Sequence, residues 1–80
     1  MTNEEIKTKL TAIFRDVFDN NSIVLSRETT AADIEDWDSL AQISLLVAIE
    51  QEFKIKLSLE EVKSLRNVGD MLDVIQRKVS

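Results

Sequence analysis

The chain has 80 residues with 15 acidic and 10 basic side chains, a net charge of −5, one glycine, no proline, no cysteine and no histidine. Disulfides and the usual Cys/His zinc frameworks are therefore excluded, and the acidic balance argues against a protein that binds nucleic acid. So little glycine and proline favours helices joined by polar loops. We expect one domain over residues 1–80.

The ends of the chain and its apolar runs predict where the protein works. The first five residues, MTNEE, contain neither a basic stretch nor an apolar one, so we expect no signal peptide. No apolar run approaches the roughly 20 residues that are needed to span a bilayer. We expect a cytoplasmic monomer without stable membrane insertion.

Residues 3–18 predict a first helix. Thr2 and Glu5 have the spacing of a capping box. Apolar side chains recur at helical intervals on one face, namely Ile6, Leu10, Ile13, Phe14, Val17 and Phe18. The polar run 19–22 ends the helix.

Residues 19–38 predict a long loop. A strand at 22–26 is rejected because no other segment offers a partner strand. We expect Ile23, Leu25 and Ile34 to anchor the loop over the helices, and residues 30–33 to make a helical turn.

Residues 39–53 predict a second helix, with Asp38 as its N-cap and Lys54 just past its end. At about 100° per residue its apolar side chains fall into two stripes, which cover roughly 220° of the circumference. The first stripe is Leu45, Leu46, Ile49 and Phe53, and the second is Leu40, Ile43 and Val47. Three other short helices can hardly surround both stripes, so we expect the second stripe to be a docking surface.

The last third of the chain predicts two more helices. Ile55 and Leu57 in the link should plug the core, and a second capping box, Ser58 with Glu61, opens a short helix through about Leu65. Asn67 then caps a last helix, whose core face is Val68, Met71, Leu72, Ile75 and Val79. The predicted fold is all-α, a four-helix bundle with a short third helix.

Ser39 is the candidate functional residue, at the start of the second helix. A hydroxyl there faces unpaired backbone N–H groups and the positive end of the helix dipole, which favours a phosphate. Catalysis is disfavoured because the chain has no histidine to act as a base. Glu35, Asp36 and Asp38 are hard oxygen ligands, but they lack the glycine and the distant glutamate of an EF-hand loop. We therefore expect no catalytic residue and no resident metal.

The element order and the motif around Ser39 resemble the acyl carrier proteins. The resemblance rests on Asp38-Ser39-Leu40 at a helix start, on the helix end at 50–53 (EQEF), and on a last helix that opens with 67–70 (NVGD). It runs through nearly the whole chain. Asp-Ser-Leu alone is common in proteins, whereas its placement in a chain of this length and element order is specific.

The resemblance implies a discrete carrier and not an enzyme. Ser39 would receive 4′-phosphopantetheine from coenzyme A, through a phosphodiester installed by a phosphopantetheinyl transferase of the holo-acyl-carrier-protein synthase type. Asp38 would help the transferase's magnesium ion approach the serine. The thiol of the arm would hold an acyl group as a thioester for partner enzymes, which include acyl-carrier-protein synthetases, acyltransferases and ketosynthases.

The resemblance also implies a surface that these partners read. In the family an apolar patch follows the serine, at positions that correspond here to Leu40, Ile43 and Val47. With Asp38 and Glu50 they form the expected partner-binding set. Leu45, Leu46 and Ile49 would instead line the interior against which a tethered chain folds.

Departures from the family pattern concern charge and one aromatic residue. Ala41, Ser44 and Gln51 stand where fatty-acid carriers commonly have acids, and Lys63 also replaces a common acid. Trp37 stands before Asp38, where a small residue is usual, and we expect it to fill space by packing. These departures favour a specialised lipid, polyketide or surface-molecule pathway over housekeeping fatty-acid synthesis.

Two alternatives stay open on the sequence alone. A peptidyl or aminoacyl carrier would share the bundle and the arm. A helical interaction module without modification would use the apolar stripe to bind one protein, with Ser39 serving only as part of the helix start.

Overall fold

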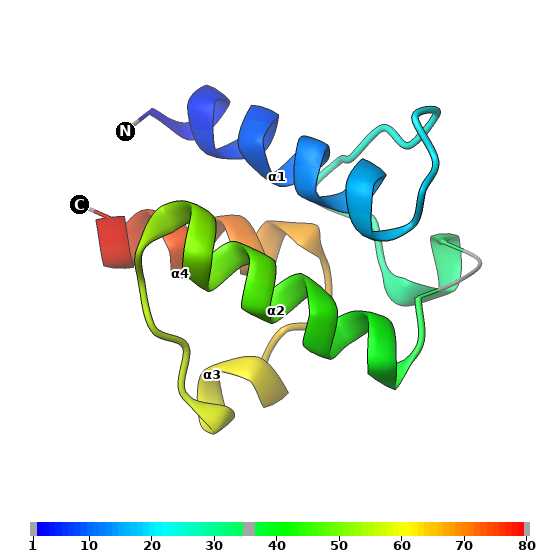
Figure 1. Ribbon diagram of the computed structural model, residues 1–80. Coiled ribbons are helices and arrows are strands. Elements are labelled where there is room, and N and C mark those ends of the chain that lie inside the picture. Colours follow the sequence, from blue (N-terminus) through cyan, green and yellow to red (C-terminus); the bar gives the residue numbers. More distant parts are fainter. Residues whose placement is uncertain (1, 35–36, 80) are drawn as a thin grey trace.

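The computed structural model describes residues 2–34 and 37–79. This part of the chain contains four α-helices and one short 3-10 turn, in the order α1, turn, α2, α3, α4 (Figure 1). No strand occurs in it. The predicted four-helix fold, with a short third helix and a long first loop, is confirmed.

Helix α1 spans Asn3–Val17 and begins where the capping box predicts. The Thr2 hydroxyl accepts a hydrogen bond from the Glu5 N–H at 3.2 Å, and the Glu5 carboxylate accepts one from the Thr2 N–H at 3.2 Å. The helix ends one residue earlier than predicted. Phe18 leaves helical geometry, and Asp19 adopts a left-handed conformation with φ 49°, which turns the chain away from the helix axis.

Helix α2 spans Ser39–Phe53 and ends at Lys54, which takes the left-handed cap conformation with φ 55°. Helix α3 spans Leu59–Lys63 and opens with the predicted capping box. It ends two residues short of the predicted Leu65, because the Ser64 N–H bonds carbonyls three and four residues back and the Leu65 N–H bonds Val62 at 3.2 Å. This tightening is typical of a helix terminus.

Helix α4 spans Val68–Val79. The Asn67 side chain accepts a hydrogen bond from the Asp70 N–H at 2.9 Å, so Asn67 is the cap that the sequence predicts. The loop also contacts this helix start: the Val68 N–H donates to the Thr29 carbonyl and the Gly69 N–H to the Arg27 carbonyl, both at 2.9 Å. These two bonds satisfy N–H groups that a helix start leaves without helical partners.

The long loop is held down by the predicted anchors. Ile23 and Leu25 are buried and Ile34 is half-buried. The predicted helical turn is the 3-10 turn Ala31–Asp33, at whose start the Asp33 carboxylate accepts the Thr30 N–H at 2.9 Å. Residues 19–34 are therefore held against the helices by side-chain burial and by hydrogen bonds to the backbone.

The core lies where α1 packs against α2 and α4, with α3 and its links to one side (Figure 1). Its largest fully buried side chains come from α1, the loop, α2 and α4: Phe14, Ile6, Leu10, Leu25, Leu45, Ile49, Ile75 and Val68. Ile55 and Leu57 pack partly buried against this core, as predicted. No helix in the described ranges is long and apolar enough to cross a membrane.

Candidate functional site

Ser39 is the first residue of α2, and its side chain is exposed. Asp38 precedes it as the N-cap: its carboxylate accepts the Ala41 N–H at 2.9 Å, and its carbonyl accepts the Gln42 N–H at 2.9 Å. The cap fixes the first turn and leaves earlier N–H groups of the turn facing outward beside the serine. The hydroxyl therefore stands in the positive field of a helix start, which suits a phosphate ester.

Within residues 2–34 and 37–79, no side chain is hydrogen-bonded to the Ser39 hydroxyl as a base. The chain has no histidine or cysteine, and the carboxylate next to the serine, that of Asp38, is engaged as the helix cap. A serine hydroxyl needs an adjacent base to act as a nucleophile. The geometry fits attachment of a group by another protein better than catalysis by this one.

Trp37 fixes the approach to Ser39 by packing, as predicted. Its ring meets the Phe14 ring edge-on, with centroids 5.2 Å apart and planes at 85°, and lies 6.4 Å from the Phe18 ring. Its indole N–H donates to the Gln42 side-chain oxygen at 2.6 Å. One side chain thus ties the residue before the cap both to α1 and to the first turn of α2.

The two apolar stripes of α2 have opposite environments. Leu45, Ile49 and Phe53 are buried, and Leu46 is half-buried. The other stripe faces solvent, with exposed fractions of 75% at Leu40, 59% at Ile43 and 47% at Val47. We call these last three residues the exposed stripe. Because a surface helix needs only one apolar face for the core, the exposed stripe is available for contact with another molecule.

The acids at the end of α2 have internal partners that the sequence does not reveal. The Glu50 carboxylate accepts the Leu57 N–H at 2.9 Å, which braces the link to α3. Glu52 pairs with Lys9 of α1 at 3.5 Å. Glu50 is half-buried, so the structure gives it an intramolecular role beside the partner contact that the sequence predicts.

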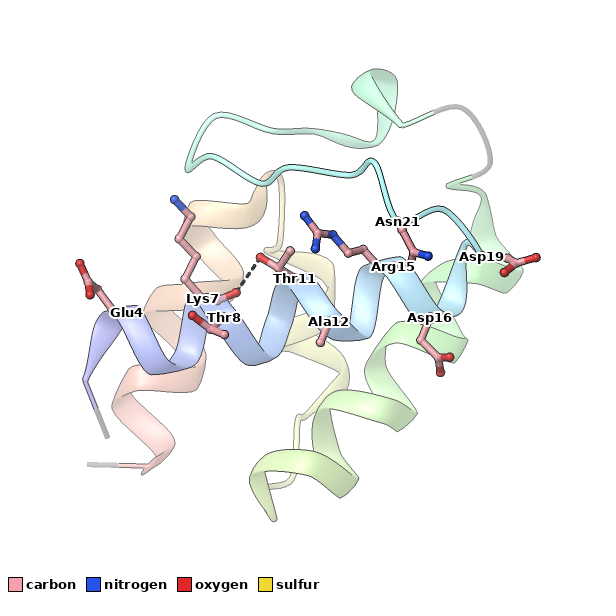
Figure 2. A pocket seen from close by; sticks show the side chains of 9 residues that line it. All are labelled: Glu4, Lys7, Thr8, Thr11, Ala12, Arg15, Asp16, Asp19 and Asn21. Carbon is pink, nitrogen blue, oxygen red and sulfur yellow. Dashed lines mark hydrogen bonds between the residues drawn. The ribbon is translucent and has the colours of Figure 1, made fainter.

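An open hollow lies on the outer face of α1 and at the start of the following loop (Figure 2). Its cations, Lys7 and Arg15, lie between Glu4 at one end and Asp16 and Asp19 at the other. Arg15 donates to the Ile23 carbonyl at 2.9 Å and so holds the loop. This face gathers no single charge, and we assign it no ligand.

Two residues considered as metal ligands, Glu35 and Asp36, lie outside the described residues. The third, Asp38, caps α2. Among the described residues no group of three acids is placed to hold a metal ion. The expectation of no resident metal stays a prediction.

Ser39 is therefore an exposed serine directly after a helix cap, at the start of α2 in a four-helix bundle. Residues 8–75 match the family model described as the phosphopantetheine attachment site. The chain is 35% identical over 75 residues to an acyl carrier protein of Acidothermus cellulolyticus, which covers 94% of this chain and 89% of that protein. It is 32% identical to a meromycolate extension acyl carrier protein of Mycolicibacterium smegmatis, over 95% of this chain and 77% of that one.

Solved structures agree with these relatives. The solution structure of a holo acyl carrier protein from Geobacter metallireducens superposes with a TM-score of 0.87 at 51% identity, over 91% of this chain and 84% of that one. The chain belongs to the phosphopantetheine-binding acyl carrier proteins. It is a carrier and not an enzyme, its prosthetic group is phosphopantetheine, and the family works with phosphopantetheinyl transferases and acyl-handling enzymes.

Proposed function

We propose that Ser39 carries the 4′-phosphopantetheine arm. The observation that supports this is the exposed Ser39 hydroxyl at the start of α2, inside the range 8–75 that matches the family model. The Ser39 oxygen would bond to the pantetheine-side phosphorus of the coenzyme A pyrophosphate as the bond from this phosphorus to the bridging oxygen breaks. Adenosine 3′,5′-bisphosphate would leave, and the transferase would take up the hydroxyl proton. Asp38 and the helix N–H groups would hold the site, and the arm would supply the thiol that this cysteine-free chain lacks.

Intact mass spectrometry tests the attachment point. The purified protein is incubated with coenzyme A and a broad-range phosphopantetheinyl transferase. We expect a mass gain of one phosphopantetheinyl group, and none in Ser39→Ala. Ser44→Ala is the matched control, because Ser44 is exposed on the same helix, and this variant should load like the wild type. A gain that survives in Ser39→Ala would refute the assignment.

We further propose that partner enzymes read the exposed stripe, with Asp38 and Glu50 at its two ends. Three large apolar side chains left in solvent at i, i+3 and i+7 make a continuous surface beside the tether. Truncating a buried anchor of an interface typically costs more than about 1 kcal/mol in binding, which corresponds to a factor of about five or more.

Kinetics of loading test this surface. We expect Ile43→Ala to lower kcat/KM of the transferase about five- to tenfold. Val24→Ala is the control, since Val24 is 79% exposed but lies in the first loop and not on α2. If both variants are loaded equally well, the exposed stripe does not take part in recognition by this enzyme.

The pathway is proposed to be specialised: lipid, polyketide or surface-molecule synthesis. Support comes from the neutral residues at Ala41, Ser44 and Gln51 and from the internal partners of Glu50 and Glu52, which leave little free acid along α2. Basic synthase surfaces would then bind this carrier weakly. Activity equal to that of a fatty-acid carrier with ketosynthases in a reconstituted assay would contradict the proposal.

Three further properties stay predictions. We propose that residues 1–80 act as one acyl-carrier-type domain, that the protein is a monomer, and that it works in the cytoplasm. Sedimentation at micromolar concentration checks the second, and fractionation of its own cells checks the third.

A further inference from the structure

A shallow hollow opens directly beside Ser39. It is lined by Ala31 of the 3-10 turn, by the loop end and by the first turn of α2, with Trp37, Asp38, Ser39, Gln42 and Ile43. Its walls are mainly apolar, through Ala31, Trp37 and Ile43. Because Ser39 itself is part of the wall, the first atoms of any group attached there lie at the edge of this hollow.

Gln42 gives the hollow a fixed polar group. Its side-chain oxygen accepts the indole N–H of Trp37 at 2.6 Å. The indole nitrogen is a donor only, so this bond sets the orientation of the Gln42 amide. The amide nitrogen keeps two N–H donors, and no acceptor within residues 2–34 and 37–79 takes them. The hollow therefore combines apolar walls with an oriented amide donor.

The tether that the proposed function places on Ser39 has matching chemistry. After its phosphate come a methylene, a carbon with two methyl groups, a carbon with a hydroxyl group, and an amide carbonyl. We propose that this first, pantoyl part of the arm rests in the hollow. Its methyl groups lie against Trp37 and Ile43, and its oxygen atoms accept from the Gln42 amide nitrogen. The inference rests on the proposed attachment at Ser39 and names the residues that hold the arm near its origin.

The hollow in which we place the pantoyl part, called the seat below, shares one residue with the exposed stripe. Ile43 lines the hollow and is also the middle residue of the stripe. A partner that covers Ile43 competes with the resting arm for the same side chain.

Nuclear magnetic resonance tests the seat directly. The chain contains a single tryptophan, so its indole N–H gives one signal. Protein labelled with ¹³C and ¹⁵N is loaded with unlabelled coenzyme A, and loading is verified by mass. We expect isotope-filtered NOEs from the arm's methyl protons to the Trp37 ring, and an apo-to-holo shift of the indole and of the Gln42 side-chain amide.

The possible results distinguish a failure of the proposed seat from a failure of the proposed attachment at Ser39. Full loading without NOEs to Trp37, and without a shift of its indole signal, would overturn the seat and leave Ser39 as the attachment point. Failure to load would overturn both.

A pair of variants tests the amide. Gln42→Ala removes the donor while keeping a good helix former, and we expect the apo-to-holo shift of the indole signal to fall at least twofold. Gln51→Ala makes the same change at an exposed position near the other end of α2 and should leave that shift unchanged. Equal shifts in both variants would remove Gln42 from the seat.

Discussion

Replacing Trp37 tests how the approach to Ser39 is held in place. Trp37→Leu removes the edge-on contact with Phe14 and the indole bond to Gln42. An aromatic pair contributes about 0.5–1.5 kcal/mol beyond area burial, and a hydrogen bond contributes about 0.5–1.5 kcal/mol net. We therefore expect a loss of about 1–3 kcal/mol, a sizeable part of the roughly 4–12 kcal/mol expected for a domain of this length.

Trp37→Phe separates the two contributions. A phenylalanine ring keeps an aromatic partner for Phe14 but has no donor for Gln42, so this variant should lose about 0.5–1.5 kcal/mol. Gln42 is only half-buried, so water can bond its unpaired oxygen in this variant. The loss should therefore lie near the lower end of this range, at about 0.5 kcal/mol. The order of stability should be wild type, then Trp37→Phe, then Trp37→Leu.

Urea unfolding followed by far-ultraviolet circular dichroism measures these differences, because the helix signal does not depend on the tryptophan. Val24→Ala serves as a control, since an exposed side chain is expected to change stability by no more than about 0.5 kcal/mol. A Trp37→Leu protein as stable as this control would refute the packing role of Trp37.

Two further predictions concern α3 and α4. The Ser58 N–H and the Lys78 ammonium hold the pKa of Glu61 at about 2, from an ordinary value of 4.5. Its charged form stabilises the fold above pH 4.5, so the free energy of unfolding lost in Glu61→Gln should shrink as the pH falls from 4.5 towards 2. A difference between wild type and variant in urea unfolding that does not change with pH would contradict this. At Gly69 an added Cβ would lie 3.0 Å from the Arg27 carbonyl oxygen. The steric cost of about 1–3 kcal/mol outweighs the gain of at most about 1 kcal/mol from alanine's higher helix propensity. Gly69→Ala should therefore lower Tm by several degrees. A higher Tm would show that the loop at Arg27 can move to make room for the methyl group.

The helix starts were predictable because a cap is local chemistry. Thr2, Asp38, Ser58 and Asn67 each accept the N–H bond that their spacing predicts. A side-chain oxygen at a fixed short distance along the chain leaves a pattern in the sequence. Helix ends leave a weaker pattern when no glycine is present, which is why α3 stops earlier than predicted.

The contacts between distant backbone groups could not be predicted. Gly69 lies in the first turn of α4, where it is buried and its N–H donates to the Arg27 carbonyl. Every residue has a backbone carbonyl, so the bonds that the carbonyls of Arg27 and Thr29 accept leave no pattern in the sequence. The contact between the loop and α4 therefore could not be predicted. The bond from Leu57 to Glu50 is missed for the same reason, because its donor is a backbone N–H.

More of the candidate site than of the loop contacts could be predicted from the sequence, because Ser39 and the exposed stripe lie on one helix. Periodicity alone places Leu40 and Val47 on one face, and the count of available helices indicates that this face stays outside the core. Seven residues at about 1.5 Å each put the ends of the stripe about 10 Å apart along a rigid axis that begins at Ser39. If the arm is attached at Ser39 and partners bind the exposed stripe, as we propose, a partner that holds this axis would also fix the origin of the arm. Recognition and delivery would then depend on the same helix, and the hollow beside Gln42 would be where the arm rests before a partner binds.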